Sequence, residues 1–307
     1  IRPVELDPGA TARLEVPLEI PARANGLLAI RASLRIDGEA WDSMETGLVA
    51  LGAPAEVSPL VLEDNYLRYG DRPIFLFGSD SYANVYTSAA HGPLLWEREI
   101  AAARDHGFQI HENLHSSSPG HVLADLDWSR FLGMAHLVRG AGMTFMPGIL
   151  IGHDVAAPDE EIAAQSRQCR EYAERLGDVP RLIWYVNGDY QLRHDHLPSL
   201  RRKWARFLRE SHGDLGRLRE AWSEEMPAVE TALGHPPSDL DDVPFLPPVS
   251  GRWDSRPSID LARFHAKLVT DWNAAHVAAI RSAESARPIT SEYYQIPFGG
   301  IDLRLTI

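Results

Sequence analysis

Hydrophobic and polar positions alternate strictly near the start of the chain. Aliphatic residues occupy every second position between residues 12 and 20, and again between residues 28 and 36. A period of two is typical of half-buried strands in an antiparallel sheet, and a third apolar run at 44–51 extends the pattern. We therefore predict a partial, β-sandwich-like domain over residues 1–53, followed by a proline-containing linker over residues 54–65.

From residue 66 onward, a hairpin over 66–77 leads into short apolar runs that alternate with amphipathic segments. Expected strands begin near residues 74, 108, 143 and 182, at intervals of 34, 35 and 39 residues. Helices are expected in the gaps between them, at 94–106, 128–139 and 160–176. Such a spacing is typical of repeated βα units that build a parallel sheet through right-handed crossovers.

The regular spacing breaks after the strand that begins near residue 182. Helices are expected at 199–212, 214–222 and 259–284, and a proline-rich, polar stretch at 227–257 is expected to contain no core element. Two further strands, at 288–294 and 301–307, bring the total to six. A closed barrel needs eight strands. Since no Gly-x-Gly-x-x-Gly motif follows the first strand, the sequence favours an incomplete (β/α)8 TIM barrel, cut short before its last two strands.

The apolar run at 182–186 ends abruptly in the polar residues Asn187, Gly188 and Asp189. A buried parallel strand has this appearance, and barrel enzymes carry their catalytic groups at the carboxyl ends of such strands. Asp189 is therefore the first candidate for a catalytic group. The alternative is that Asp189 caps the following helix, because aspartate favours caps and turns.

Composition limits the classes of partner. The formal net charge of −13 argues against nucleic acid and anionic membranes, which both require a basic surface. No apolar run reaches the roughly 18 residues of a membrane span. The single cysteine, Cys169, excludes an internal disulfide and a cysteine-rich metal site. The chain starts at Ile1, and its sequence leads us to expect no signal peptide. Its compartment stays open between cytoplasm and secretion, as does its oligomeric state.

Three segments resemble retaining glycoside hydrolases of the family 42 β-galactosidase group. Residues 184–190, Trp-Tyr-Val-Asn-Gly-Asp-Tyr, resemble that family's Trp-x-x-x-Asn-Glu-Tyr strand end. Residues 204–213 and 218–222 resemble its helical signature, Trp-Leu-x-x-x-Tyr-Gly followed by Leu-Asn-x-x-Trp-Gly. Pro288 and Ile301 also fall where the family has its fifth and sixth strands, so that the resemblance covers about residues 66–307.

The resemblance implies retaining hydrolysis of terminal β-glycosides, with β-galactosides as the suggested substrate class and no cofactor or metal. It also implies that Asp189 is the acid/base, although the family has glutamate at this position and asparagine where this chain has Gly188. The family's nucleophile follows the seventh strand, which this chain does not reach. Other expected strand ends supply candidates for contact with a sugar, namely Asp80, Glu112, Asn113, His153, Asn187, Glu292 and Tyr293.

Two alternatives remain open. Residues 111–115, His-Glu-Asn-Leu-His, match the His-Glu-x-x-His pattern of zinc metallopeptidases, with His121 at the spacing of a third ligand. That pattern needs a helix, which brings the two histidines onto one face, whereas residues 108–110 read as a strand. The second alternative is a barrel that binds carbohydrate without cleaving it, because a fold does not determine an activity.

Overall fold

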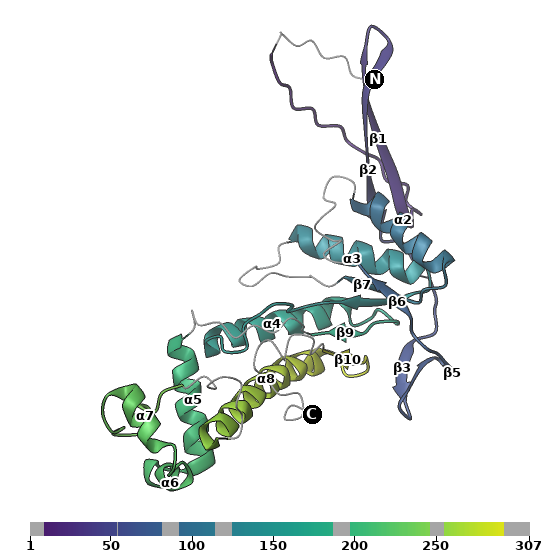
Figure 1. The fold of residues 1–307 in the computed structure, drawn as a ribbon. Helices are drawn as coiled ribbons and strands as arrows, with labels where there is room; N and C mark the ends of the chain where they lie inside the picture. The colour runs from purple at the N-terminus through teal and green to yellow at the C-terminus, as the bar shows by residue number, and fades with distance from the viewer. Residues whose placement is uncertain are drawn as a thin grey trace.

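The computed structural model describes residues 9–53, 55–81, 92–113, 125–186, 197–245 and 255–291 (Figure 1). Its centre is a parallel sheet flanked by helices. An antiparallel hairpin projects from one end of the molecule, and a group of short helices lies at the other end (Figure 1).

Five strands follow one another in the parallel sheet. They are β6 (Gly78–Asp80), β7 (Ile110–Asn113), β8 (Thr144–Pro147), β9 (Trp184–Tyr185) and β10 (Ile289–Thr290). The first three pair directly, the last two pair with each other, and bridges from Phe145 to Leu182 and from Gly148 to Tyr185 join the two groups. The spatial order equals the chain order, as in a (β/α)8 barrel. The described strands thus form an incomplete TIM barrel, and the sixth expected strand, 301–307, lies outside the described residues.

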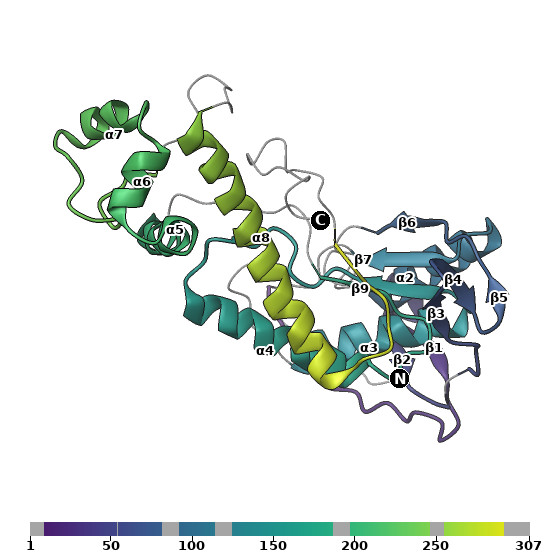
Figure 2. The ribbon, with the colours of Figure 1, turned by 90° about the horizontal axis from the view of Figure 1, so that it is seen from below.

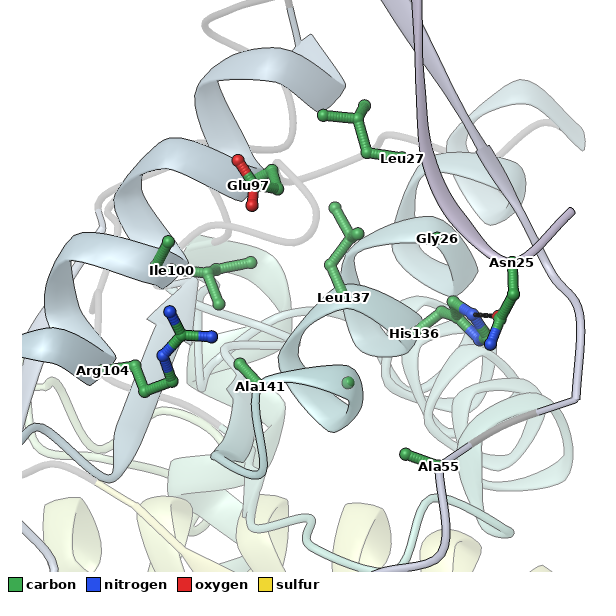
Figure 3. Close-up of a pocket in the computed structure, with 12 residues that line it drawn as sticks. Asn25, Gly26, Leu27, Ala55, Glu97, Ile100, Arg104, His136, Leu137 and Ala141 are labelled. Carbon is green, nitrogen blue, oxygen red and sulfur yellow. Dashed lines mark hydrogen bonds between the residues drawn. The ribbon is translucent and has the colours of Figure 1, made fainter.

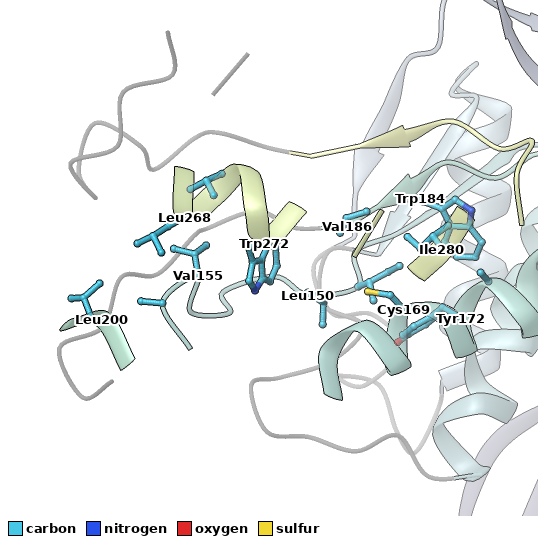
Figure 4. Close-up of a cluster of buried hydrophobic side chains, with 14 of the residues drawn as sticks. Leu150, Val155, Cys169, Tyr172, Trp184, Val186, Leu200, Leu268, Trp272 and Ile280 are labelled. Atoms are coloured by element: carbon cyan, nitrogen blue, oxygen red, sulfur yellow. The ribbon is translucent and has the colours of Figure 1, made fainter. Parts of the chain in front are cut away.

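Helices α2 (Gly92–Asp105), α3 (Asp125–Gly140), α4 (Asp159–Leu176) and α8 (Arg256–Ala283) connect and cover these strands (Figures 1 and 2). Side chains from the sheet, α4 and α8 meet in one buried core (Figure 4). Tyr172 of α4 lies edge-on to Trp128 and Phe131 of α3, with ring centroids 4.7 and 5.6 Å apart. Burial of these rings helps to hold α3 and α4 together against the sheet.

A helical unit is inserted between β9 and α8. It comprises α5 (Leu197–His212), α6 (Leu215–Ala221) and α7 (Met226–Leu233), and both views place it at the far end of α8 from the sheet (Figures 1 and 2). Trp204 of α5 packs against Phe264 of α8 with ring centroids 5.1 Å apart. The buried Asp260 of α8 accepts a hydrogen bond of 2.8 Å from Trp222 Nε1, and its Oδ2 lies 2.8 Å from His212 Nε2.

Helix α7 corrects the prediction that residues 227–257 contain no core element. Met226 and Val229 are both buried in the core. Pro227 occupies the first turn of the helix. A proline is tolerated there, because the first turn has no intrahelical partner for the backbone N–H group that proline lacks. The many prolines in this stretch therefore hid a short helix that has a proline in its first turn.

A small antiparallel sheet closes the amino-terminal side of the parallel strands. It consists of β3 (Leu60–Glu63), β4 (Tyr66–Tyr69) and β5 (Arg72–Pro73), which form a meander with a turn at Gly70 between β4 and β5. Strand β3 lies inside the predicted linker 54–65, which is therefore shorter than expected. The apolar residues 74–77 precede strand β6 instead of forming it.

Arg181 joins this small sheet to the barrel. Its guanidinium lies 3.6 Å above the Tyr69 ring, its Nε donates a 2.9 Å hydrogen bond to Ser58 O, and its Nη1 donates to Gly142 O. The Tyr69 hydroxyl is 2.8 Å from Thr144 Oγ1 at the start of β8. Cation–π stacking and hydrogen bonds thus act together at one contact.

The first part of the chain forms a two-stranded hairpin of β1 (Gly26–Ile36) and β2 (Glu39–Ala50). Residues 12–20 were predicted to join it as a third strand, and this prediction is wrong: the segment pairs with no strand among the described residues. Pro17 and Pro21 supply the reason, because proline has no N–H group for a sheet ladder.

We predict that Arg181→Ala lowers the free energy of unfolding by roughly 1–3 kcal/mol, since it removes a cation–π contact and two hydrogen bonds at a partly buried site. Urea unfolding followed by circular dichroism measures the change. Arg170→Ala serves as the control: it removes an exposed ion pair with Glu174 within α4, for which about 0.5 kcal/mol or less is expected. Equal losses in the two variants would contradict the role assigned to Arg181.

Candidate functional site

The carboxyl ends of the parallel strands lie side by side at one edge of the sheet. Asp80, Glu112 and Met146 are register partners on β6, β7 and β8. The N–H group of Ser81 donates a 3.0 Å hydrogen bond to Glu112 O, which holds the first two strand ends together. Two of the predicted site residues, Asp80 and Glu112, are therefore neighbours, although they are separated by 32 positions in the sequence.

These two carboxylates lie on the side of the sheet that faces away from the main core. His111 and Phe145 are register partners, and Phe145 belongs to the buried core beneath the helices. Successive residues of a strand point to opposite faces, so Glu112 and its partners point to the other face, the inner side of the barrel arc. Asp80 is exposed and Glu112 is half-buried, so solvent reaches both.

Asn113 follows Glu112 and is fully buried. Its carbonyl oxygen accepts a 2.8 Å hydrogen bond from Gly148 N, directly after β8. Asn113 shares its face of the strand with His111, because the two are two residues apart. The structure therefore separates Asn113 from Asp80 and Glu112, and its contact with a sugar stays a prediction.

His153 lies in the loop between β8 and α4, where it is 3% exposed. Its Nδ1 is 3.3 Å from the carbonyl oxygen of Ile151. The next residue, Asp154, caps the loop, with Oδ1 accepting a 2.9 Å hydrogen bond from Ala156 N. His153 thus belongs to a compact, buried loop at the same edge of the sheet as Glu112.

His276, a buried histidine of α8 that interacts electrostatically with His153, is not among the residues predicted from the sequence. Its ring centroid is 4.2 Å from that of Trp272, one turn earlier on the helix. Burial lowers the pKa of His276 from 6.5 to about 4, and it lowers the pKa of His111 to the same value. The sequence contained one signal for His276: it follows Trp272 by four residues, which places both on the apolar stripe of the predicted helix 259–284.

Strand β9 brings the chain to this same edge. Ile149 N donates to Tyr185 O over 2.8 Å, and Val186 N donates to Thr290 O over 3.0 Å, so the end of β9 lies between the ends of β8 and β10. Asp189 is three positions after Val186 in the sequence, but it lies outside the described residues. The same is true of Asn187, Glu292 and Tyr293.

The described part of the zinc motif corrects the peptidase alternative. His111 and Glu112 belong to strand β7, so their side chains point to opposite faces and not along one face of a helix. His115 and His121 lie outside the described residues. Among the residues that are described, no group of three or more histidine, cysteine or acidic side chains is arranged to hold a metal ion.

A separate cavity of about 520 Å³ lies away from the strand ends, between α2, α3 and the base of the hairpin (Figure 3). Glu97 and Arg104 line it from α2, and His136 from α3, with His136 Nε2 2.6 Å from Asn25 Oδ1. None of the predicted site residues that the structure describes lines this cavity. It is therefore distinct from the edge where the candidate site lies.

A family model for the β-galactosidases of glycoside hydrolase family 42 matches residues 162–304. The match covers just under half of the chain and includes most of α4, all of β9 and the helical insertion. No curated protein matches the chain. The resemblance noted in the segments around Trp184 and Trp204 is therefore confirmed over this region.

Solved structures of β-galactosidases have a similar fold. The enzyme from Halorubrum lacusprofundi is 18% identical with a TM-score of 0.52 over 71% of this chain and 36% of that one. The enzyme from Bacillus circulans is 15% identical with a TM-score of 0.51 over 70% and 36%. The enzyme from Rahnella sp. R3 is 14% identical with a TM-score of 0.52 over 81% and 39%. The chain thus has the fold of part of a TIM-barrel glycoside hydrolase, and spans little more than a third of the length of these proteins.

No helix in the described ranges is both long enough and apolar enough to cross a membrane. This finding agrees with the absence of a long apolar run in the sequence.

The buried histidines predict loss of stability in mild acid. The folded-state pKa values of His276 and His111, about 4, lie below the ordinary value of 6.5. Between these two pH values the unfolded chain binds protons that the folded protein does not bind. The free energy of unfolding therefore falls as the pH is lowered from 6.5 toward 4, by up to about 3 kcal/mol for each histidine.

Urea unfolding at several pH values between 7 and about 4 measures this dependence. His276→Phe removes one of the titrating groups, so the variant is expected to lose less stability on acidification than the unmodified protein. His235→Phe is the control, because His235 is exposed and its substitution leaves the core intact. An unchanged pH dependence in His276→Phe would show that His276 does not remain neutral in the folded protein.

Proposed function

We propose that this protein is a retaining β-glycosidase that hydrolyses terminal β-galactosides. One observation carries the proposal: the match to the family 42 model includes the end of β9, the strand that leads directly to Asp189. The substrate class rests on the family description and on the printed names of the structural relatives. Carbohydrate is accordingly the proposed partner.

The proposed reaction needs two carboxyl groups. In retaining glycosidases one carboxylate attacks the anomeric carbon, and the other first protonates the leaving oxygen and then deprotonates the attacking water. Asp189 is proposed as the acid/base. The carboxyl group must lose its proton in one step and regain it in the next, and burial beside apolar groups or close to a second carboxylate raises a carboxyl pKa enough for this exchange.

Asp80 and Glu112 are proposed to bind sugar hydroxyl groups. Their register pairing places two acceptors on one face, and a pair of adjacent hydroxyl groups on a pyranose ring presents two donors. His153, Asn113, Asn187, Glu292 and Tyr293 are proposed to complete the sugar site from neighbouring strand ends. The reaction requires no metal or cofactor in this proposal.

The acid/base assignment is tested in a form of the protein that continues through the strand carrying the nucleophile. Asp189→Asn is expected to lower kcat for alkyl β-galactosides about 10²- to 10⁴-fold, because poor leaving groups depend most on protonation. Added azide should restore turnover of aryl β-galactosides, since azide attacks the glycosyl intermediate without a general base. Asp178→Asn, at an exposed position before β9, is the control and should retain activity.

Unchanged hydrolysis of alkyl β-galactosides in Asp189→Asn would overturn the role of Asp189. Binding of galactose without turnover in the unsubstituted protein would instead favour a carbohydrate-binding barrel that has no catalytic activity.

The sugar-binding role of Glu112 is tested on residues 1–307 themselves by calorimetric titration with galactose. Glu112→Gln is expected to weaken binding about tenfold or more, because a charged acceptor for a hydroxyl contributes roughly 1.5–3 kcal/mol. Glu160→Gln, an exposed position on α4, is the matched control. Equal affinity in the two variants would remove Glu112 from the sugar site.

A further inference from the structure

Helix α5 concentrates positive charge in a chain that is acidic as a whole. It contains four arginines and one lysine but a single acidic residue, Glu210. The complete chain, by contrast, has a formal net charge of −13. The first turn of α5 contains no acidic residue that would offset the cations after it. Such a local reversal of charge is typical of a surface that attracts an anionic partner.

Three of the arginines lie on one exposed face of the helix. Arg202, Arg206 and Arg209 are separated by four and three residues, so their side chains follow one another along the same side. We call this side the arginine face. The side chains of Arg206 and Arg209 are 60% and 47% exposed, and Arg202 is exposed as well. Trp204 and Leu208, on the opposite side of α5, are buried.

The spacing of these arginines is unfavourable for the helix by itself. Like charges three or four residues apart repel one another on a helix surface. One aspartate of α4 offsets this repulsion in part: Asp159 Oδ1 is 2.7 Å from Lys203 Nζ, and Asp159 Oδ2 is 3.5 Å from Arg206 Nη2. A single carboxylate thus serves two cations, and positive charge remains.

The excess charge is greatest at the amino-terminal end of the arginine face. Within the ranges that the structure describes, no hydrogen bond or ion pair involves the side chains of Arg201 and Arg202. Arg209, farther along the helix, pairs with Asp241. A guanidinium group presents five N–H donors in a planar fork that matches the two oxygen atoms of a carboxylate. Arg202 therefore has its full donor capacity available for an external anion.

Helix α5 starts beside the loop that follows strand β8. Ser199 Oγ donates a 3.4 Å hydrogen bond to Ala157 O in this loop, and Lys203 reaches Asp159 at the start of α4. The same loop contains His153, which is proposed to belong to the sugar site. From this contact α5 leads away toward α6 (Figures 1 and 2). The arginine face therefore begins next to the loop that borders the proposed site of the terminal sugar.

We propose that the arginine face binds carboxylate groups of uronic acid residues in an acidic glycan, whose terminal β-galactoside enters the site at the strand ends. This inference rests on the proposed function, because it takes the glycan to be the substrate of that site. It narrows the substrate class to β-galactosides that are attached to a uronate-containing chain.

Carboxylates are the anions that this helix already binds within the chain. Arg206 and Arg209 are both paired with aspartate side chains, Asp159 and Asp241. Arginine can hold a carboxylate through two parallel N–H···O hydrogen bonds, a geometry that lysine does not provide. A uronate residue presents the same two oxygen atoms, and Arg202 offers a guanidinium without an internal partner.

The extent of the arginine face favours a glycan over a nucleic acid. Seven residues separate Arg202 from Arg209, which corresponds to about 10 Å at the rise of an α-helix. A nucleic acid strand carries a phosphate about every 3.4 Å, so it would continue beyond this face onto a chain whose net charge is −13. A glycan in which neutral sugars separate the carboxylates avoids most of this repulsion.

Calorimetric titration of residues 1–307 with hexagalacturonate at low ionic strength tests the proposal. Methyl-esterified hexagalacturonate has the same sugars without the charges, and it should bind at least about tenfold more weakly. The affinity for the charged ligand should fall as salt is added, because salt screens exposed charges.

Arg202→Glu is expected to weaken the binding of hexagalacturonate about tenfold or more. The side chain is exposed and has no internal partner, so the variant should fold normally, which circular dichroism verifies. Arg98→Glu, at an exposed position of α2, is the matched control. It changes the net charge by the same amount and should leave the affinity unchanged.

Equal affinities in Arg202→Glu and Arg98→Glu would overturn the proposal, since the net charge alone would then explain the binding. The absence of hexagalacturonate binding would also overturn it, as would equal binding of the methyl ester. Tighter binding of a sulfated galactan oligosaccharide or of single-stranded DNA would reject uronate as the ligand of this face.

A titration of the same protein with galactose separates this inference from the proposed function. If galactose binds and hexagalacturonate does not, only the inference about the arginine face fails. If hexagalacturonate binds with the expected dependence on Arg202 and galactose does not bind, the arginine face is confirmed as a uronate site and the proposed function is contradicted.

Discussion

The register of the parallel strands is the constraint on which the rest of the structure depends. Pairing of β6 with β7, and of β7 with β8, places Asp80 beside Glu112 and His111 beside Phe145 at the same time. If the pairing shifted by one residue, these side chains would move to the opposite faces of the sheet. His111 and Phe145 would then point to the inner side, and the carboxylates of Asp80 and Glu112 would enter the helix-covered core. Burial of Phe145 and of the rings packed above it therefore determines which side chains are available for chemistry. In this sense the hydrophobic core selects the candidate site.

The βα architecture could be predicted from the sequence because its signals are long and periodic. The stripe of apolar residues on α4 and α8 and the glycines that end the helices locate each helix to within a few residues. Strands were harder to locate: residues 74–77 are more apolar than the strand Gly78–Asp80 that follows them, and only the pairing with β7 decides between the two. The linker prediction failed at β3 for a similar reason, since Leu60 is buried and its N–H group donates a hydrogen bond to the carbonyl oxygen of Pro180, which is distant in the sequence.

Candidate site residues were predictable where they follow a strand and less so where they lie on a helix. Asp80 and Glu112 are adjacent because parallel strand ends meet at one edge, a rule that needs only the strand positions. His276 escaped notice, because a histidine on an apolar helical stripe looks like any other core residue until the packing of α8 against α4 is known. The zinc pattern shows the opposite kind of error, a predicted site that the secondary structure excludes. Its spacing brings two histidines together only on a helix, and β7 is a strand.

The helical insertion contains the residues on which part of the resemblance to family 42 depends. The residues that carry the helical signature, Trp204, Leu218 and Trp222, are all buried, and the Trp222 indole is held by Asp260 on α8. They fasten the insertion to the barrel and lie far along α8 from the strand ends. A protein could therefore keep this signature after losing every catalytic group, because selection for folding alone would preserve it. For chains of this kind, the signature reports on the architecture, and the strand ends must be read separately to learn whether they carry the catalytic groups.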